Sequence, residues 1–242
     1  MGMFDKLKTD GHEEQKDRLG GGYSALETDI YTGKILAAYG GKSSGGALNV
    51  TLVFEHPTGK YNETIYVSNK KGENFFMSDD KKVSLPGFTT INNICLILTG
   101  KPLDEQEMED KVFLVWDKEA SKELPKSLPA LVNIMGEEIS FAISKSLENK
   151  NKLEGDVYVP TEETRDVNNI EHVFHTESRM TVTEATNGVE TAEFWDKWLD
   201  KNKGVTKDKT KKVGGVAGKP GGAPHSAAGA SVAPRKSLFN KG

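Results

Sequence analysis

The stretch ALNVTLVFEHPTGKYNETIYV, Ala47 to Val67, decides the fold class of this chain. Its first nine residues alternate apolar and polar side chains, which is typical of a strand with one buried face. HPTGK then supplies turn residues, so the rest of the stretch is predicted to return as the second strand of a hairpin. The residues of the first strand predicted to face inward are Leu48, Val50, Leu52 and Phe54.

The returning strand has its own alternation. Ile65 and Val67 are predicted to face inward, and Thr64, Tyr66 and Ser68 to face outward. An aromatic ring on the outward face of a strand is available to a ligand, so the ring of Tyr66 is a candidate for ligand contact.

A longer strand precedes the hairpin, and a helix follows it. Glu27 to Tyr39 reads as a strand with Gly33 at its middle, where a strand bends or bulges. In FTTINNICLILTGKP the apolar residues recur at helical spacing, Gly100 is predicted to end the helix, and Thr89 or Thr90 to cap its start. The apolar residues of this helix are Ile91, Ile94, Cys95 and Leu98.

The second half of the chain reads as further strands and a last helix. The apolar run Lys111 to Asp117 predicts a buried strand, and Glu138 to Leu147 a long one. DVYVP, IEHVFH and RMTVTEA are three more predicted strands, and Thr191 to Gly204 places Phe194, Trp195, Trp198 and Leu199 along one helical side. Together these elements predict a mainly β fold: an OB-type Greek-key barrel with one capping helix, extra hairpins and a C-terminal helix.

Charge and composition divide the chain into three parts. Residues 1–22 are predicted to be a flexible arm, 23–204 the folded domain, and 205–242 a disordered tail rich in Gly, Ala, Pro and Lys. The net charge is −4, but from Gly204 onward eight Lys and Arg face one acidic residue, Asp208, so this part carries +7. The remainder has 24 basic and 35 acidic residues and carries −11. Local clusters of cations, rather than the sum, decide whether a polyanion binds.

Cysteine usage and hydropathy indicate where the protein works. The single cysteine, Cys95, excludes an internal disulfide framework and a cysteine-based zinc site, as expected of a protein in a reducing compartment. No run approaches the roughly 20 apolar residues of a membrane helix, and the N-terminus has no apolar signal core. We therefore expect a soluble protein in a cytoplasm, with no membrane partner.

The sequence offers little for catalysis. His172 and His175 are three apart in a predicted strand, so they face opposite sides and are poorly placed to share a metal ion. No nucleophile-elbow, Walker or dinucleotide-binding motif is present. The acidic segment Asp104 to Asp110 reads as a solvated loop, although a metal-dependent nuclease remains an open alternative. We expect no cofactor, no metal ion and no enzymatic activity.

The segment after the second hairpin strand combines cations with aromatic rings. A protein that binds a single nucleic-acid strand needs cations near the phosphates and flat rings on which bases stack. The alternative for each phenylalanine is a place in the core, and for the lysines a solvated turn. The candidate DNA-binding residues are Tyr66, Lys70, Lys71, Phe75, Phe76, Lys81 and Lys82.

Two further groups carry weaker signals. Lys118, Lys122 and Lys126 follow the run that contains Trp116, but we expect a buried Trp116 and solvated lysines there. The basic tail is the other group: it either adds salt-dependent phosphate contacts or is a solubilising linker.

Several strings together resemble a group of bacteriophage single-stranded-DNA-binding proteins, OB-fold proteins broadly similar in role to those of T7-like phages. The likeness covers most of residues 20–204. The strings are NKKGENFF (Asn69–Phe76), KKVSLPGFTTINNICLILTGKPL (Lys81–Leu103), LPKSLPALVNIMGEEISFAI (Leu124–Ile143), FWDKWLDKNKG (Phe194–Gly204) and APRKSLF (Ala233–Phe239).

The resemblance implies sequence-independent binding of single-stranded DNA in phage DNA replication, recombination and repair, in the host cytoplasm. It also implies contacts with replication or recombination proteins through the C-terminal tail. Such tails are commonly acidic with a terminal aromatic, whereas this tail is basic around Phe239, so autoinhibition by the tail does not carry over. Two other functions stay open: a structural or assembly protein of the virion, and a DNA-processing nuclease.

Overall fold

The computed structural model describes residues 25–117, 119–155 and 157–213 and is mainly β, with one large antiparallel sheet and few helices. The helices and strands of the described residues are, in chain order, β1 (Asp29–Lys42), β2 (Leu48–His56), β3 (Gly59–Tyr66), β4 (Phe75–Ser78), β5 (Lys81–Ser84), α1 (Pro86–Thr99), β6 (Glu109–Asp117), β7 (Lys122–Ala130), β8 (Glu138–Glu154), β9 (Val157–Phe174), α2 (Val182–Thr186), α3 (Phe194–Asn202) and β10 (Thr206–Asp208). Two single-turn 3-10 helices lie at Leu103–Glu105 and Val132–Ile134.

The chain forms two compact units. The first comprises the described residues up to Leu147 and Asp166–Asp208. The second comprises the described residues of Glu148–Arg165 together with those from Lys209 onward.

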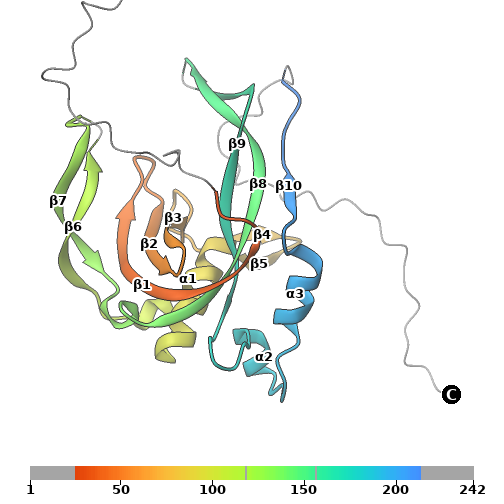
Figure 1. The fold of residues 1–242 in the computed structure, drawn as a ribbon. Coiled ribbons are helices and arrows are strands. Elements are labelled where there is room, and N and C mark those ends of the chain that lie inside the picture. Colours follow the sequence, from red (N-terminus) through yellow and green to blue (C-terminus); the bar gives the residue numbers. More distant parts are fainter. Residues whose placement is uncertain (1–24, 118, 156, 214–242) are drawn as a thin grey trace, which may run out of the picture. The chain divides into compact units, whose positions relative to one another are not determined.

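The long, curved strand β1 organises the first unit (Figure 1). Its first half pairs with β8, from Asp29 opposite Ile143 to Lys34 opposite Glu138. Its second half pairs with β2, and β2 pairs with β3. The change of partner occurs at Lys34, which is opposite both Glu138 of β8 and Glu55 of β2, and the register of β1 shifts between Ile35 and Ala37. The residue before Lys34 is Gly33, the glycine at which the sequence predicts a bend or bulge, and the β2 backbone passes too close there for any side chain.

The sheet is open between β3 and β9, which are not hydrogen-bonded neighbours. One side chain spans this opening. The Glu63 carboxylate on β3 accepts a hydrogen bond from the backbone N–H of Ile170 on β9, at 3.0 Å, and another from the Tyr61 hydroxyl at 2.6 Å. Burial raises the pKa of Glu63 above its ordinary value, against these two hydrogen bonds, which act to lower it.

The core of the first unit lies between the curved sheet and α1. Phe54 on β2 and Phe141 on β8 are fully buried and meet edge to face, with 4.7 Å between ring centroids. Helix α1 buries Ile91, Ile94 and Cys95 against this cluster, as their spacing predicts. Burial raises the pKa of the Cys95 thiol to about 12, so this cysteine packs as a small apolar side chain.

The ends of α1 confirm one prediction and correct another. Gly100 ends the helix in the left-handed conformation and donates its N–H to the Leu96 carbonyl. Neither Thr89 nor Thr90 caps the start. The helix begins at Pro86, whose missing N–H costs nothing in a first turn, and both threonine hydroxyls donate to backbone carbonyls one turn earlier.

The orientations predicted for the hairpin are right in its middle and wrong at its open end. Val50, Leu52, Phe54, Ile65 and Val67 are buried as predicted, and Thr64 and Tyr66 face outward. Leu48, predicted inward, is 45% exposed, and Ser68, predicted outward, is buried. The reason is a pair of hydrogen bonds made by the Ser68 hydroxyl, which accepts from the Leu48 N–H and donates to the Asn69 carbonyl. These two hydrogen bonds turn the chain out of the sheet.

Three further predictions are corrected by the structure. The run Lys111–Asp117 lies in a strand, β6, but this strand is not buried, because it forms a projecting hairpin with β7. RMTVTEA is not a strand: α2 starts there at a capping box, in which Thr181 and Glu184 bond each other's backbone N–H. Thr206–Asp208, within the segment predicted to be a disordered tail, forms β10 and pairs parallel with β8.

The C-terminal helix is confirmed. Phe194, Trp195, Trp198 and Leu199 of α3 pack with Phe174 and Ala142 in a second apolar cluster of the first unit. The described residues of DVYVP, from Val157 onward, and those of IEHVF belong to one long strand, β9, rather than to two.

The described part of the second unit is a polar two-stranded ribbon. The Asn149 amide donates to the Thr161 carbonyl at 2.8 Å, and Lys150 pairs with Glu163 at 3.0 Å. Tyr158 is 69% exposed.

None of the helices in the described ranges is long and apolar enough to cross a membrane. The predicted arm 1–22 and the predicted tail from residue 214 onward, including Phe239, lie outside the described residues.

Candidate nucleic-acid interface

Tyr66, the first of the predicted contact residues, lies at the end of β3 with 52% of its surface exposed. It stands opposite Asn49 of β2 on the outer face of the sheet. The backbone beneath it is held from the other side, because Gly87 of α1 lies against the Tyr66 carbonyl so closely that a Cβ at Gly87 would be 2.2 Å from that oxygen. The ring is therefore presented to solvent by a fixed backbone.

Lys70 and Lys71 lie in a turn that Asn69 orders. The Asn69 side-chain oxygen accepts from the N–H groups of Lys71 and Glu73, at 2.9 and 3.0 Å. Its amide donates to the Glu73 carboxylate at 2.8 Å, so this nearby acid is held by the asparagine. The turn presents both lysines on an ordered backbone, a few residues from the Tyr66 ring.

The connection between β1 and β2 brings a further lysine to this turn. A Cβ added to Gly45 would lie 3.2 Å from the Lys70 Cε, and one added to Gly46 would lie 3.2 Å from the Lys70 carbonyl oxygen and 3.9 Å from the Lys42 Cε. The glycines thus allow the stems of Lys42 and Lys70 to converge on the same loop. Sequence reasoning did not include Lys42 in the site.

The hairpin of β4 and β5 separates the remaining predicted residues. Because Phe75 and Phe76 are adjacent in a strand, their side chains point to opposite faces. Phe75 shares its face with Lys82, whose ammonium lies 4.5 Å from the ring centroid, and Phe76 shares the other face with Lys81. These four candidate residues therefore do not share one face of the hairpin.

The exposure of the two rings differs. Phe76 is 46% exposed, whereas Phe75 is partly buried under the Lys82 side chain. Neither ring is sealed in the core, so the alternative of a core position is wrong for Phe76 and holds only in part for Phe75.

Tyr39 is an aromatic residue of the outer face that sequence reasoning missed. The register places Tyr39 of β1 opposite Thr51 of β2, and Thr51 opposite Thr64 of β3, with 2.9 Å between the two threonine hydroxyls. Residues directly opposite in antiparallel strands share a face. Tyr39 and Tyr66 therefore stand on the same outer face, one near each side of the three strands. The alternation around the buried Ala38 was the available signal.

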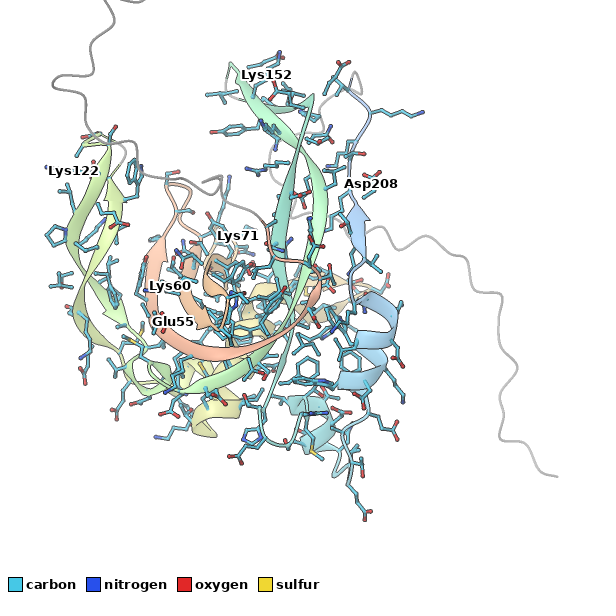
Figure 2. The ribbon with its side chains drawn as sticks, viewed as in Figure 1. Glu55, Lys60, Lys71, Lys122, Lys152 and Asp208 are labelled. Carbon is cyan, nitrogen blue, oxygen red and sulfur yellow. The ribbon has the colours of Figure 1, made fainter. Side chains whose placement is uncertain are left out.

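Several lysines of the candidate segments lack a carboxylate partner, as do others elsewhere in the described residues, such as Lys34, Lys101 and Lys201. Within the described ranges, no carboxylate lies at ion-pair distance from Lys42, Lys70, Lys71 or Lys81. Lys60, at the opposite end of β3 from Lys71 (Figure 2), pairs with Glu55 at 3.8 Å. The lysines that do have a carboxylate partner are Lys60, Lys111, Lys145, Lys150, Lys152, Lys197, Lys203, Lys207 and Lys209.

The described part of the chain holds no group of three or more His, Cys, Asp or Glu side chains that would bind a metal ion. His172 packs edge to face on Phe194, with 4.8 Å between ring centroids, and burial lowers its pKa. His175 instead contacts the Ser178 hydroxyl. The two histidines therefore have separate structural contacts.

Comparison of the chain with protein-family models, with curated proteins and with solved structures found no match. The interpretation of this surface rests on its own geometry.

Proposed function

We propose that this protein binds single-stranded DNA without sequence preference, through the outer face of β1, β2 and β3 and the adjoining lysine turn. One observation carries the proposal: an exposed ring, Tyr66, is followed at once by a turn that holds Lys70 and Lys71 outward with no carboxylate partner among the described residues. Rings stack on bases of any kind and ammonium groups attract phosphates, so the pair of features suits an unpaired strand of any sequence.

The fold is consistent with this proposal. We interpret β1, β2, β3, α1, β8 and β9 as an OB-type barrel that is left open between β3 and β9. In that fold the face of the second and third strands binds nucleic acid, and Tyr66, Thr51 and Thr64 lie on the corresponding face here. The protein would act without catalysis, by covering single strands during phage DNA replication, recombination and repair.

A titration of fluorescently labelled oligo(dT) with the full chain tests the proposal. Binding should weaken as salt rises from about 50 to about 200 mM, and duplex of the same length should bind poorly. Lys70→Ala with Lys71→Ala should make the slope of log K against log salt shallower by about 1.4, since each phosphate contact to a single strand contributes about 0.7.

The matched control is Lys197→Ala with Lys201→Ala on α3, which removes the same charge far along the chain from the turn. It should leave affinity and slope unchanged. Absence of binding by the wild-type protein at low salt would refute the proposal, and magnesium-dependent loss of the oligonucleotide would indicate a nuclease instead.

One observation favours a second candidate, a structural or assembly protein. The side chains of Val112, Leu114 and Trp116 on β6 are 70%, 66% and 61% exposed. An apolar strip of this kind often marks contact with another protein. Concentration-dependent self-association in sedimentation experiments without DNA, abolished by Trp116→Ser, would support that function.

A further inference from the structure

The hairpin of β6 and β7 has two faces of different chemistry. Each residue of β6 stands directly opposite one of β7, from Glu109 opposite Ala130 to Asp117 opposite Lys122, so alternate pairs share a face. The lysine face consists of Glu109, Lys111, Phe113, Val115 and Asp117 with Lys122, Leu124, Lys126, Leu128 and Ala130. The apolar face consists of Asp110, Val112, Leu114 and Trp116 with Glu123, Pro125, Ser127 and Pro129.

The lysine face continues the outer face of the sheet. Ala130 of β7 is opposite both Glu109 of β6 and Tyr39 of β1, so the side chain of Tyr39 lies on the lysine-face side. A ring contact agrees with this register: the rings of Tyr39 and Phe113 are 4.6 Å apart between centroids and inclined by 31°. Tyr39 is also opposite Thr51 in β2, so the surface continues toward Tyr66.

Two lysines of this face, Lys122 and Lys126, have no carboxylate at ion-pair distance within the described ranges, and Lys126 is the one beside the rings. It stands directly opposite Phe113 and is exposed. Lys111 instead pairs with Glu109 at 3.2 Å. Lys122, at the tip of the hairpin (Figure 2), stands opposite Asp117, whose carboxylate accepts from two backbone N–H groups of the turn.

We propose that Tyr39, Phe113 and Lys126 form a second nucleotide-binding subsite, which receives the single strand beyond Tyr66. The inference rests on the proposed function. Its own support is that two neighbouring rings and a lysine without a carboxylate partner among the described residues lie on one continuous face. A strand that follows the outer face toward β1 reaches this group next, where a base can stack on the exposed side of the rings while Lys126 contacts a phosphate.

The apolar face does not suit the same ligand, although it carries the more exposed ring. Trp116 stands opposite Glu123, and Asp110 lies on the same face. The apolar face has no lysine to offset its two carboxylates, whereas the lysine face carries three lysines beside Glu109 and Asp117. The subsite is therefore assigned to the face with Phe113 and not to the face with Trp116.

The test compares variants on the two faces of the one hairpin, using a labelled oligo(dT) of about 30 nucleotides, longer than a single OB fold covers. Phe113→Leu should weaken binding by at least about fivefold, the low end of the effect of losing one stacked base. Lys126→Gln should make the salt slope shallower by about 0.7. Trp116→Ala, on the apolar face, should bind as wild type.

A second measurement separates a binding role from a folding role. The number of nucleotides covered per protein on poly(dT) should fall in Phe113→Leu with Lys126→Gln, a change that mere loss of stability does not produce. Lys126 is exposed, so its single variant keeps the hairpin intact if Phe113→Leu disturbs it.

The outcomes are distinct. If wild type binds oligo(dT) and responds to the Lys70 and Lys71 variants while the Phe113 and Lys126 variants match wild type, the subsite is refuted and the proposed function stands. If Trp116→Ala alone weakens binding, the assigned face is wrong. If wild type does not bind oligo(dT) at all, the proposed function itself fails.

Discussion

Gly33 is the residue on which the path of β1 depends most directly. The next residue, Lys34, is where the strand leaves β8 and joins β2. A Cβ built on Gly33 would lie 2.0 Å from the Glu55 carbonyl oxygen, 2.8 Å from the Glu55 carbonyl carbon and 3.0 Å from the His56 Cα. All three are backbone atoms, so no side-chain rotation relieves the overlap. Gly33→Ala must therefore push the end of β2 away from β1.

The structure allows the cost to be estimated. Ordinary contact begins at 3.4 Å, so the Glu55 oxygen must move by the difference from 2.0 Å, which is 1.4 Å. A shift of that size disturbs the pairing of Lys34 with Glu55 and of Ile35 with Phe54, and Phe54 is fully buried. Overpacking of about 1–3 kcal/mol and the loss of about two ladder hydrogen bonds at about 1 kcal/mol each give a loss of about 3–5 kcal/mol.

Urea denaturation followed by far-ultraviolet circular dichroism measures this loss. With a denaturant dependence of about 1–3 kcal/mol per molar, Gly33→Ala should lower the midpoint by about 1 M or more. Gly40→Ala is the matched control on the same strand, because its Cβ would lie 3.5 Å from the Met108 Cε and the Pro129 Cγ, in ordinary contact. It should change stability by no more than about 1 kcal/mol. Equal midpoints for the two variants would show that Gly33 is not required for the close approach.

Three further predictions concern β3 and the turn after it. The first is Glu63→Gln. In the wild type the pKa of Glu63 is raised, which means that the folded state binds the proton more tightly than the unfolded state does. The wild type therefore loses stability as pH rises from 4.5 through the raised pKa. The variant should match wild type at low pH and gain on it above that window in urea titrations, and a pH-independent difference would contradict the assignment. Tyr66→Ala should weaken oligo(dT) binding by about 5- to 150-fold, whereas Tyr66→Phe, which keeps the ring, should retain affinity in the same anisotropy assay. Asn69→Ala should weaken binding without changing the salt slope, because it removes the hydrogen bonds that order the turn and none of the charge of the turn. A shallower slope would contradict this and would argue that the lysines move away from the DNA.

Local pattern was sufficient to predict the centre of the fold. Alternation in β2 and β3 and helical spacing in α1 identify the residues that pack together, because each element presents one apolar face to one core. The close approach at Gly33 was also readable, since a glycine inside a strand signals a close approach or a bend, although the register of β1 shifts between Ile35 and Ala37. The capping box of Thr181 and Glu184 was present in the sequence as well, and the alternation of RMTVTEA concealed it.

The features of the fold that the sequence did not reveal depend on which elements pack or pair with one another. β6 is apolar on both faces and therefore resembles a buried strand, but burial requires a layer on each side, and the hairpin projects instead. The parallel pairing of Thr206–Asp208 with β8 joins segments about 60 residues apart, which no local pattern encodes. The same limit applies to the site. Residues adjacent in sequence, Phe75 and Phe76, were grouped, whereas Tyr39 and Phe113, which meet through the sheet, were not.

The distribution of ion pairs bears on the proposed binding of DNA, because the chain as a whole has a net charge of −4. Lysines on α3, at the start of β3 and along β8 face carboxylates, so their charge is locally neutralised. Lys42, Lys70, Lys71 and Lys126 have no such partner within the described ranges, and they occur beside Tyr66 or Phe113. Screening over about 10 Å at 0.1 M salt keeps distant acids from cancelling the charge of these four lysines. If this account is right, binding should follow the charge of these four lysines and not the net charge of the chain.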